Sequence, residues 1–450
     1  KNSPRNKPES ISWPRKNERC PVYSAIKKIE GKEFTTPTID PRPFSPEPTG
    51  VLVSDNRNGH LFNLDLEPII WSPTTLQDWL TCPRKGWLTH GIKASIEDSS
   101  YDEGLDSRIH GTFFHQLHYN LLSEVLGFKQ GSVREINNSE TLLNLSNCEI
   151  SDELLMQKAL EHLHELAPWL TRTDSVSKNR LRMMSGMSTI EWIKWLDKRP
   201  PVPLSGRLGE MINSEKYSLE NSTPIAFEWK FNKVELSLPK DLTAPYGKKL
   251  DTIKIKGSID RVDIIPFMID GKTIWINDKA SKDEIAPLEL YNSDWQPRRL
   301  IIIRDLKTFE KTKSRDLSNR HRKGILEELQ LALYARAWEI ENPGDLVVGV
   351  GISILGQKTT HFVETSKIDK INNIESIGEK TNVTYDKYRF LNETSEPESD
   401  PFRAWLASRI STALNISNNA QNGYFHPIPQ DNCKFCKVQN ICDVKMEATF

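Results

Sequence analysis

The most constraining feature of this 450-residue chain is a change in the spacing of its apolar residues after Pro224. Upstream, apolar side chains recur at helical spacing, whereas downstream they follow the patterns of β-strands. The sequence predicts strands over residues 225–236, 252–265, 273–277, 300–307, 346–355 and 360–364, with a helix over 325–340. Strands, one helix and further strands in this order predict an α/β fold with a mixed sheet.

The region before these strands divides into an arm and a group of helices. The first fifty residues contain nine of the chain's 27 prolines, so residues 1–68 are expected to form a disordered arm or linker. Apolar stripes predict helices over residues 72–92 and 105–126, and residues 150–222 are interpreted as a helical insertion. We therefore expect an arm followed by one domain over residues 69–450.

Charge, hydropathy and cysteine content limit the class of protein. Sixty Lys and Arg residues against 61 Asp and Glu give a net charge of −1, which excludes a protein that coats nucleic acid through bulk positive charge. No apolar run approaches the roughly 18 to 20 residues of a membrane span, so we expect a soluble protein without a membrane partner. Six cysteines are too few for a disulfide scaffold and favour a reducing, cytoplasmic setting. Because the chain starts at Lys1 rather than Met, we expect a missing upstream segment, with room for a whole domain.

Two of the predicted strands carry acidic residues where apolar side chains are expected. Asp260 lies in the middle of strand 252–265, and Asp305 lies near the end of strand 300–307, two residues before Lys307. Because side chains alternate along a strand, Asp305 and Lys307 project from the same face. Buried charges there require a metal, a phosphate or each other as partners. An isolated strand-end ion pair is the plain alternative for Asp305 and Lys307.

Three further residues are candidates for the same centre. His115 lies on the predicted helix 105–126, although a single histidine on a helix is more often solvated or part of a core. Gln330 and Tyr334 are four residues apart on helix 325–340, so both lie on one face of that helix. Without the carboxylates, this pair carries little information.

Taken together, these segments resemble the RecB-like branch of the PD-(D/E)XK nuclease superfamily. The matching segments are residues 110–115, 257–263, 305–308 and 330–334, in the order that the family has. The resemblance covers roughly residues 72–445 and implies a restriction-endonuclease-like mixed sheet flanked by helices.

The resemblance also implies the metal ligands. His115, Asp260 and Asp305 would bind a divalent cation, with the carbonyl of Leu306 as a further candidate ligand. Carboxylate oxygens with one imidazole suit Mg²⁺ or Mn²⁺. Lys307 would act on the attacked phosphate as a positive point charge.

A supporting helix and the choice of histidine follow from the same resemblance. Gln330 and Tyr334 would match the family's Q-x-x-x-Y helix, which supports the site and the DNA. His110 and His118 lie close to the candidate ligand in sequence, but the G-T-x-x-H spacing selects His115.

Three of the six cysteines lie within ten residues near the C-terminus, at Cys433, Cys436 and Cys442. Cys82 is the plausible fourth thiolate from the helical start of the domain. Three clustered cysteines with one distant partner favour a [4Fe–4S] cluster, with zinc as the alternative. AddB-type nucleases are similar in this arrangement, which implies a structural clasp formed by residues 72–92 and 430–445.

A basic segment connects strand 300–307 to helix 325–340. The residues in it that we expect to bind DNA are Arg315, Arg320, Arg322 and Lys323. Because the segment joins two elements of the expected site, it would border the scissile phosphate, where Lys and Arg neutralise the nucleic-acid backbone. A solvated basic loop is the alternative.

These features predict a metal-dependent DNA nuclease that hydrolyses phosphodiester bonds. We expect an exonuclease that acts on single strands or ends in DNA recombination or repair, with a helicase as a partner or fused upstream. The alternative is a non-catalytic DNA-binding or helicase-partner module that keeps the nuclease fold as a scaffold. The intact set of His115, Asp260, Asp305 and Lys307 argues against that alternative.

Overall fold

A computed structural model describes most of the chain between residues 70 and 442. The described residues are 70–94, 107–138, 151–166, 168, 179, 181–183, 185–197, 205–217, 222–238, 252–269, 272–280, 282–288, 295–308, 324–355, 361–365, 375–376 and 401–442. The expected N-terminal arm lies outside these residues. None of the described helices is long and apolar enough to cross a membrane.

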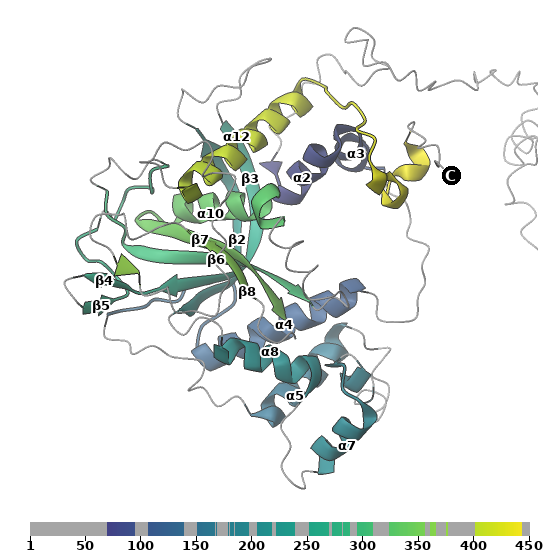
Figure 1. Ribbon diagram of the computed structural model, residues 1–450, viewed down its shortest axis with the longest axis vertical. Coiled ribbons are helices and arrows are strands. Elements are labelled where there is room, and N and C mark those ends of the chain that lie inside the picture. The colour runs from purple at the N-terminus through teal and green to yellow at the C-terminus, as the bar shows by residue number, and fades with distance from the viewer. Residues whose placement is uncertain are drawn as a thin grey trace, which may run out of the picture. The chain divides into compact units, whose positions relative to one another are not determined.

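The centre of the described fold is a six-stranded sheet with the order β1, β3, β6, β7, β8, in which β2 also pairs with β3 (Figure 1). The strands are β1 (Ile70–Trp71), β2 (Thr223–Ser237), β3 (Thr252–Ile265), β6 (Arg299–Thr308), β7 (Asp345–Leu355) and β8 (His361–Thr365). The pairs β1–β3 and β6–β7 are parallel and the other pairs antiparallel. The predicted mixed sheet of a restriction-endonuclease-like fold is therefore confirmed. A smaller sheet contains β4 (Phe267–Ile269), β5 (Lys272–Ile274) and β9 (Glu375–Ser376).

Strands β6 and β7 form the apolar middle of the sheet. All eleven residues of β7 are buried, and β6 is buried from Leu300 to Leu306. Their connection includes helix α10 (Gln330–Glu341), because parallel neighbours need a crossover that returns the chain to the same end of the sheet. This connection sets the N-terminus of α10 close to the end of β6, where Asp305 and Lys307 lie.

Helices α10, α12 (Pro401–Gln421) and α2 (Pro73–Thr81) pack together on one face of the sheet (Figure 1). Their shared core contains Trp338 of α10, Trp405 of α12 and Ile303 of β6, all fully buried. Both indole N–H groups are satisfied, because Trp338 donates to Asp345 and Trp405 donates to the carbonyl of Leu326. This face therefore holds α10 in a fixed position above β6.

Helix α4 (Ser107–Leu126) covers the opposite face. It packs Phe113 and Leu117 against Leu306, whose side chain alternates with that of Asp305 along β6. Three helices of the predicted insertion extend the same core: α5 (Asp152–Leu166), α7 (Thr189–Asp197) and α8 (Gly206–Tyr217). The helical pattern read in residues 150–222 is thus present in the described part of that segment.

The predicted helix 72–92 is divided into three pieces. It consists of α2, α3 (Pro83–Gly86) and the π-helical turn η2 (Trp87–Gly91), with Cys82 in extended backbone between the first two. The break has a local cause, since Pro83 disfavours helical backbone at the residue before it. Cys82 therefore lies at a helix junction and not on a helix face.

The predicted helix 325–340 also begins later than expected. A short helical turn over residues 324–327 precedes it, and α10 proper starts at Gln330. The backbone N–H of Leu329, just before α10, donates to the side-chain oxygen of Gln77 on α2 at 3.1 Å. A side chain of α2 thus provides a cap for the helix that carries Gln330.

Candidate active site

Three carboxylates lie in one row across three neighbouring strands. The register of β2 with β3 sets Glu228 opposite Asp260, and the register of β3 with β6, extended by one residue, sets Asp260 opposite Asp305. Side chains opposite each other on adjacent strands project from the same face and lie close together. We refer to Glu228, Asp260 and Asp305 as the carboxylate row.

Asp260 is the middle member of the row and is largely enclosed. Its side chain is 16% exposed, and Oδ2 accepts a hydrogen bond from the backbone N–H of Leu306 at 2.8 Å. Burial raises the pKa of Asp260 well above its usual range, and the charge of Asp305 raises it further. A cation between these carboxylates would relieve both effects, which favours a cation site here.

Asp305 links the row to a lysine and to α10. Its Oδ2 forms an ion pair with Lys307 Nζ at 2.5 Å, and its Oδ1 accepts a hydrogen bond from Gln330 Nε2 at 3.0 Å. Burial lowers the pKa of Lys307, but the charge of Asp305 outweighs it, so the pKa is raised and the side chain stays cationic. The Lys307 side chain is 46% exposed, so the ammonium borders solvent beside the row.

His115 approaches the row from α4. Its Nδ1 lies 3.9 Å from Asp260 Oδ2. Burial lowers the pKa of His115 to about 4, although the charge of Asp305 acts in the opposite direction. The imidazole is therefore neutral at pH 7, with a lone pair available to a metal.

The two neighbouring histidines have other surroundings. His110 Nε2 contacts Arg207 Nη1 at 2.7 Å, and the buried ring of His118 packs edge-on against Phe227. Of the three histidines, His115 is the one that lies beside Asp260.

Glu228 was missed by the sequence prediction. It lies on β2 with φ of +47°, in the left-handed region that non-glycine residues rarely adopt. Ser258 Oγ donates a hydrogen bond to Glu228 Oε2 at 3.2 Å. Burial raises the pKa of Glu228, whereas the hydrogen bond from the Ser258 hydroxyl lowers it, and the effect of burial is the larger. The sequence did show an acidic residue inside the buried half of the predicted strand 225–236. Its position at the site, however, follows only from the register of β2 with β3, which sets it opposite Asp260.

Gln330 and Tyr334 lie on one face of α10, as their spacing predicted, and this face is turned towards the row. The hydroxyl of Tyr334 is hydrogen-bonded by the Gln330 side chain and the backbone of Ser258, and burial raises the pKa of Tyr334. The Tyr334 ring packs closely on β3, where a Cβ added at Gly257 would lie 2.8 Å from its Cε1 atom. The small residue at position 257 lets α10 approach the strand that carries Asp260.

A buried charge network lies on the opposite face of the same two strands. Asp263 accepts a hydrogen bond from Arg261 Nε at 2.8 Å and pairs with Arg304 Nε at 2.9 Å, and all three side chains are at most 1% exposed. Arg261 directly follows the catalytic candidate Asp260 in the sequence, and Arg304 directly precedes the catalytic candidate Asp305. Arg261 and Asp263 thus form a buried charge pair on the face of β3 that points away from Asp260.

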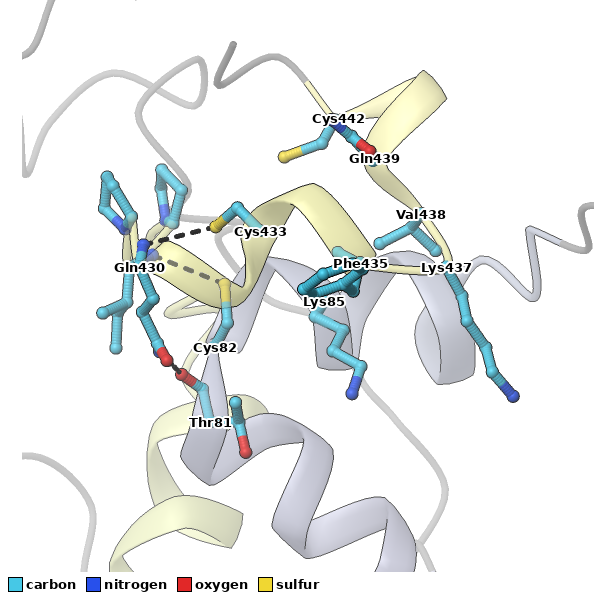
Figure 2. A pocket seen from close by; sticks show the side chains of 14 residues that line it. Thr81, Cys82, Lys85, Gln430, Cys433, Phe435, Lys437, Val438, Gln439 and Cys442 are labelled. Atoms are coloured by element: carbon cyan, nitrogen blue, oxygen red, sulfur yellow. Dashed lines mark hydrogen bonds between the residues drawn. The ribbon is translucent and has the colours of Figure 1, made fainter. Parts of the chain in front are cut away.

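Four cysteines line one pocket of about 370 Å³ at the junction of the two ends of the described fold (Figure 2). They are Cys82, Cys433 on the 3₁₀ turn η7 (Asp431–Phe435), Cys436, and Cys442 just after the 3₁₀ turn η8 (Gln439–Ile441). None of the four forms a disulfide. We refer to them as the cysteine site.

Backbone N–H groups point at two of these sulfur atoms. Ile428 N–H donates to Cys82 Sγ at 3.4 Å, and Gln430 N–H donates to Cys433 Sγ at 3.3 Å. Figure 2 shows both sulfurs directed towards the backbone around Gln430. Hydrogen bonds of this kind stabilise negative charge on sulfur, as thiolate ligands of a metal require.

The predicted DNA contacts Arg315, Arg320, Arg322 and Lys323 lie outside the described residues. These four DNA contacts stay a prediction.

A family model described as the PD-(D/E)XK nuclease superfamily matches residues 70–298 and 293–443, which together span more than half of the chain. A search of curated proteins found no match. The matched region contains the carboxylate row, Lys307, α10 and the cysteine site.

Proposed function

The chain belongs to the PD-(D/E)XK nuclease superfamily, and we propose that it is a metal-dependent DNA nuclease. The observation that carries this proposal is the position of Asp260 and Asp305 on adjacent strands, with Lys307 next on the same face of β6. Phosphodiester hydrolysis needs ligands for a cation and positive charge for the phosphate. This corner of the sheet offers both.

The donor set fits Mg²⁺ or Mn²⁺. Asp260 and Asp305 supply hard oxygen donors, and the neutral His115 imidazole supplies a nitrogen that Mn²⁺ accepts well. When bound, a divalent cation neutralises charge on the phosphate and lowers the pKa of water. The raised pKa of Asp260 supports this fit, because two facing carboxylates are unfavourable without a cation.

The remaining residues orient these groups. Lys307 presents a charged, partly exposed ammonium beside the row, where it would stabilise negative charge that develops on the attacked phosphate. Gln330 holds one oxygen of Asp305 through its amide, so the carboxylate keeps one orientation. Tyr334 in turn contacts Gln330 and keeps α10 close to β3.

We further propose single strands or DNA ends as the substrate, exonuclease action in recombination or repair, and a helicase as partner or upstream domain. The support is the order of the RecB-like motifs along the chain. Cleavage of 5′-labelled, 3′-labelled and circular single strands, with RNA counterparts, would establish polarity and substrate. Cleavage of the circular strand would contradict an exonuclease.

For the cysteine site we propose a [4Fe–4S] cluster that acts as a clasp between α2–α3 and the C-terminal segment. The support is the enclosure of four thiols around one pocket and the N–H donors aimed at two sulfurs. Iron and zinc analysis of protein purified without oxygen tests this. Zinc without iron would replace the cluster with a zinc site.

The catalytic proposal is tested by comparing Asp305→Ala with Lys307→Ala. Loss of Asp305 should weaken Mn²⁺ binding and abolish cleavage, because a ligand is removed. Loss of Lys307 should leave Mn²⁺ affinity almost unchanged while the single-turnover rate falls on the order of 10² or more, because only phosphate stabilisation is lost.

Lys254→Ala is the matched control, since Lys254 is an exposed lysine of β3 away from the row. It should behave as the parent protein, and circular dichroism should show that all three variants fold. Parental cleavage by Lys307→Ala, or normal Mn²⁺ binding and cleavage by Asp305→Ala, would favour a non-catalytic DNA-binding module.

A further inference from the structure

Arg207 is the second residue of α8, in the helical insertion, and its side chain is held at two points. Its Nη1 atom lies 2.7 Å from Nε2 of His110 on α4. Because a guanidinium only donates, the imidazole nitrogen is the acceptor of this hydrogen bond. The stem of the side chain passes over Gly186, where an added Cβ would lie 3.7 Å from both Cγ and Nε of Arg207. The side chain therefore follows one course from α8 to the beginning of α4.

The packing of α8 sets this arginine at one end of the central sheet. Leu208, next to Arg207, belongs to the buried core that also contains Leu306 of β6 and Leu355 of β7. Leu355 pairs with Thr308, the last residue of β6, so the carboxyl ends of both strands lie close to α8 (Figure 1). Arg207 thus lies at the end of β6 that carries the catalytic candidates.

Helix α4 relates this arginine to the carboxylate row. His110 and His115 are five residues apart on α4, which is about 7.5 Å along the helix axis. Between them, Gly111 borders the end of β6, since an added Cβ would lie 3.9 Å from Thr308 Oγ1. One strand of a duplex advances about 3.4 Å per nucleotide, so the two histidines are about two nucleotide steps apart. A strand with its scissile phosphate at the row would present a neighbouring phosphate to Arg207.

The chemistry of the Arg207 side chain suits a phosphate. Burial lowers the pKa of Arg207, but an arginine stays protonated at neutral pH. Its N–H groups form a planar fork that can bind two phosphate oxygens at once, and the contact with His110 uses one of five donors. Partial exclusion of water strengthens the attraction between this charge and a phosphate.

We infer that Arg207 binds a DNA phosphate that neighbours the scissile phosphate on the same strand, so that the helical insertion takes part in holding the substrate. The inference rests on the proposed nuclease function and concerns a residue outside the cation site. Lys307 would act on the attacked phosphate, whereas Arg207 would fix the position of the strand. His110 would be a positioning residue, because its imidazole holds the guanidinium against α4.

The test is the binding of a fluorescein-labelled single-stranded oligonucleotide to the full chain, measured by fluorescence anisotropy at several salt concentrations without added divalent cation. Arg207→Gln removes the charge but keeps an N–H donor for His110. Its affinity should fall about tenfold at low salt, because a charged hydrogen bond is lost. The slope of log K against log salt should become shallower by about 0.7, since one phosphate contact fewer releases fewer counterions. Arg207→Lys keeps the charge and should keep the parental slope.

Lys194→Gln is the matched control, because it removes one charge from the exposed surface of α7 in the same insertion. It should keep the parental affinity and slope, and urea titration should show that all variants fold. In single-turnover cleavage, Arg207→Gln should need about tenfold more protein for its half-maximal rate, with the maximal rate almost unchanged, because the reacting groups are intact.

Parental affinity and slope in Arg207→Gln would overturn the inference, and the contact with His110 would then only join the insertion to α4. An equally shallow slope in Arg207→Lys would also overturn it, because the loss would not follow the charge. If the parent protein cleaves DNA in either case, the nuclease stands without this contact. A salt slope that depends on Arg207 in a parent protein that cleaves no DNA would leave the contact standing and refute the nuclease.

Discussion

Replacing Asp263 with alanine tests whether the buried charge network behind the active site fixes the register of the carboxylate row. Arg261 and Arg304 are directly opposite each other on β3 and β6, and like charges so placed repel. Asp263 contacts the Nε atoms of both arginines, at 2.8 and 2.9 Å. This arrangement lets two guanidinium groups face each other beside the Asp260–Asp305 pair.

The magnitude follows from the burial of the network. The side chains of Arg261, Asp263 and Arg304 are 1%, 0% and 0% exposed, so water cannot replace the lost carboxylate. Removing one member of a buried ion pair costs about 3–5 kcal/mol, because the remaining charge is left uncompensated. Asp263→Asn should cost less than Asp263→Ala, since the amide oxygen can still accept one hydrogen bond.

The measurement is the free energy of unfolding from urea titration, with DNA cleavage on the same samples. Lys158→Ala is the control, because it breaks a partly exposed pair with Glu124 that is worth about 0–1 kcal/mol. Asp263→Ala should also cleave more slowly at saturating metal, since Asp260 and Asp305 depend on the same strand pair. A change in stability no larger than that of Lys158→Ala would refute the reasoning, because the arginines would then be neutralised by other groups.

Two further predictions concern the cysteine site and its connection to α10. Cys82→Ala should lose bound iron and should lower the free energy of unfolding, because metal binding is coupled to folding. Full iron occupancy in this variant would contradict the four-cysteine site. Gln77→Ala should leave iron content unchanged but slow cleavage, since the buried N–H of Leu329 loses its acceptor at a cost of about 1–3 kcal/mol. Gln157→Ala is its control, because Gln157 donates a hydrogen bond to Glu161 on the exposed side of α5. Equal cleavage rates for the two variants would contradict the role of Gln77 in positioning α10.

The strands and helices were largely predictable because each depends on local periodicity. The predicted strand 252–265 coincides with β3, and the alternation along β6 correctly set Asp305 and Lys307 on one face. Helix boundaries were less accurate where tertiary contacts decide them. The start of α10 depends on a cap from Gln77, which is more than 250 residues earlier in the chain.

The residues of the candidate site could be predicted only where sequence motifs of a known family indicate which residues lie together in space. His115, Asp260 and Asp305 could be grouped through a family resemblance, but no periodicity gives the register between strands. Glu228 was missed for this reason, since its relation to Asp260 exists only in the pairing of β2 with β3. The contact between Asp263 and Arg304 likewise depends on strand pairing, because it joins two strands that are about 40 residues apart.

The cysteine site and the active site are connected by one short, continuous set of contacts. Gln430 in the C-terminal segment donates to the carbonyl of Thr81, which precedes Cys82 at the end of α2. One turn earlier on α2, Gln77 accepts the N–H of Leu329 before α10, and the next residue, Gln330, holds Asp305. Each step is a hydrogen bond to a helix end or to a buried carboxylate, so the proposed clasp at one end would restrict the position of α10 at the other. If the cysteine site holds the proposed cluster, its loss is therefore expected to slow cleavage through a misplaced Gln330, without any electron transfer between the two sites.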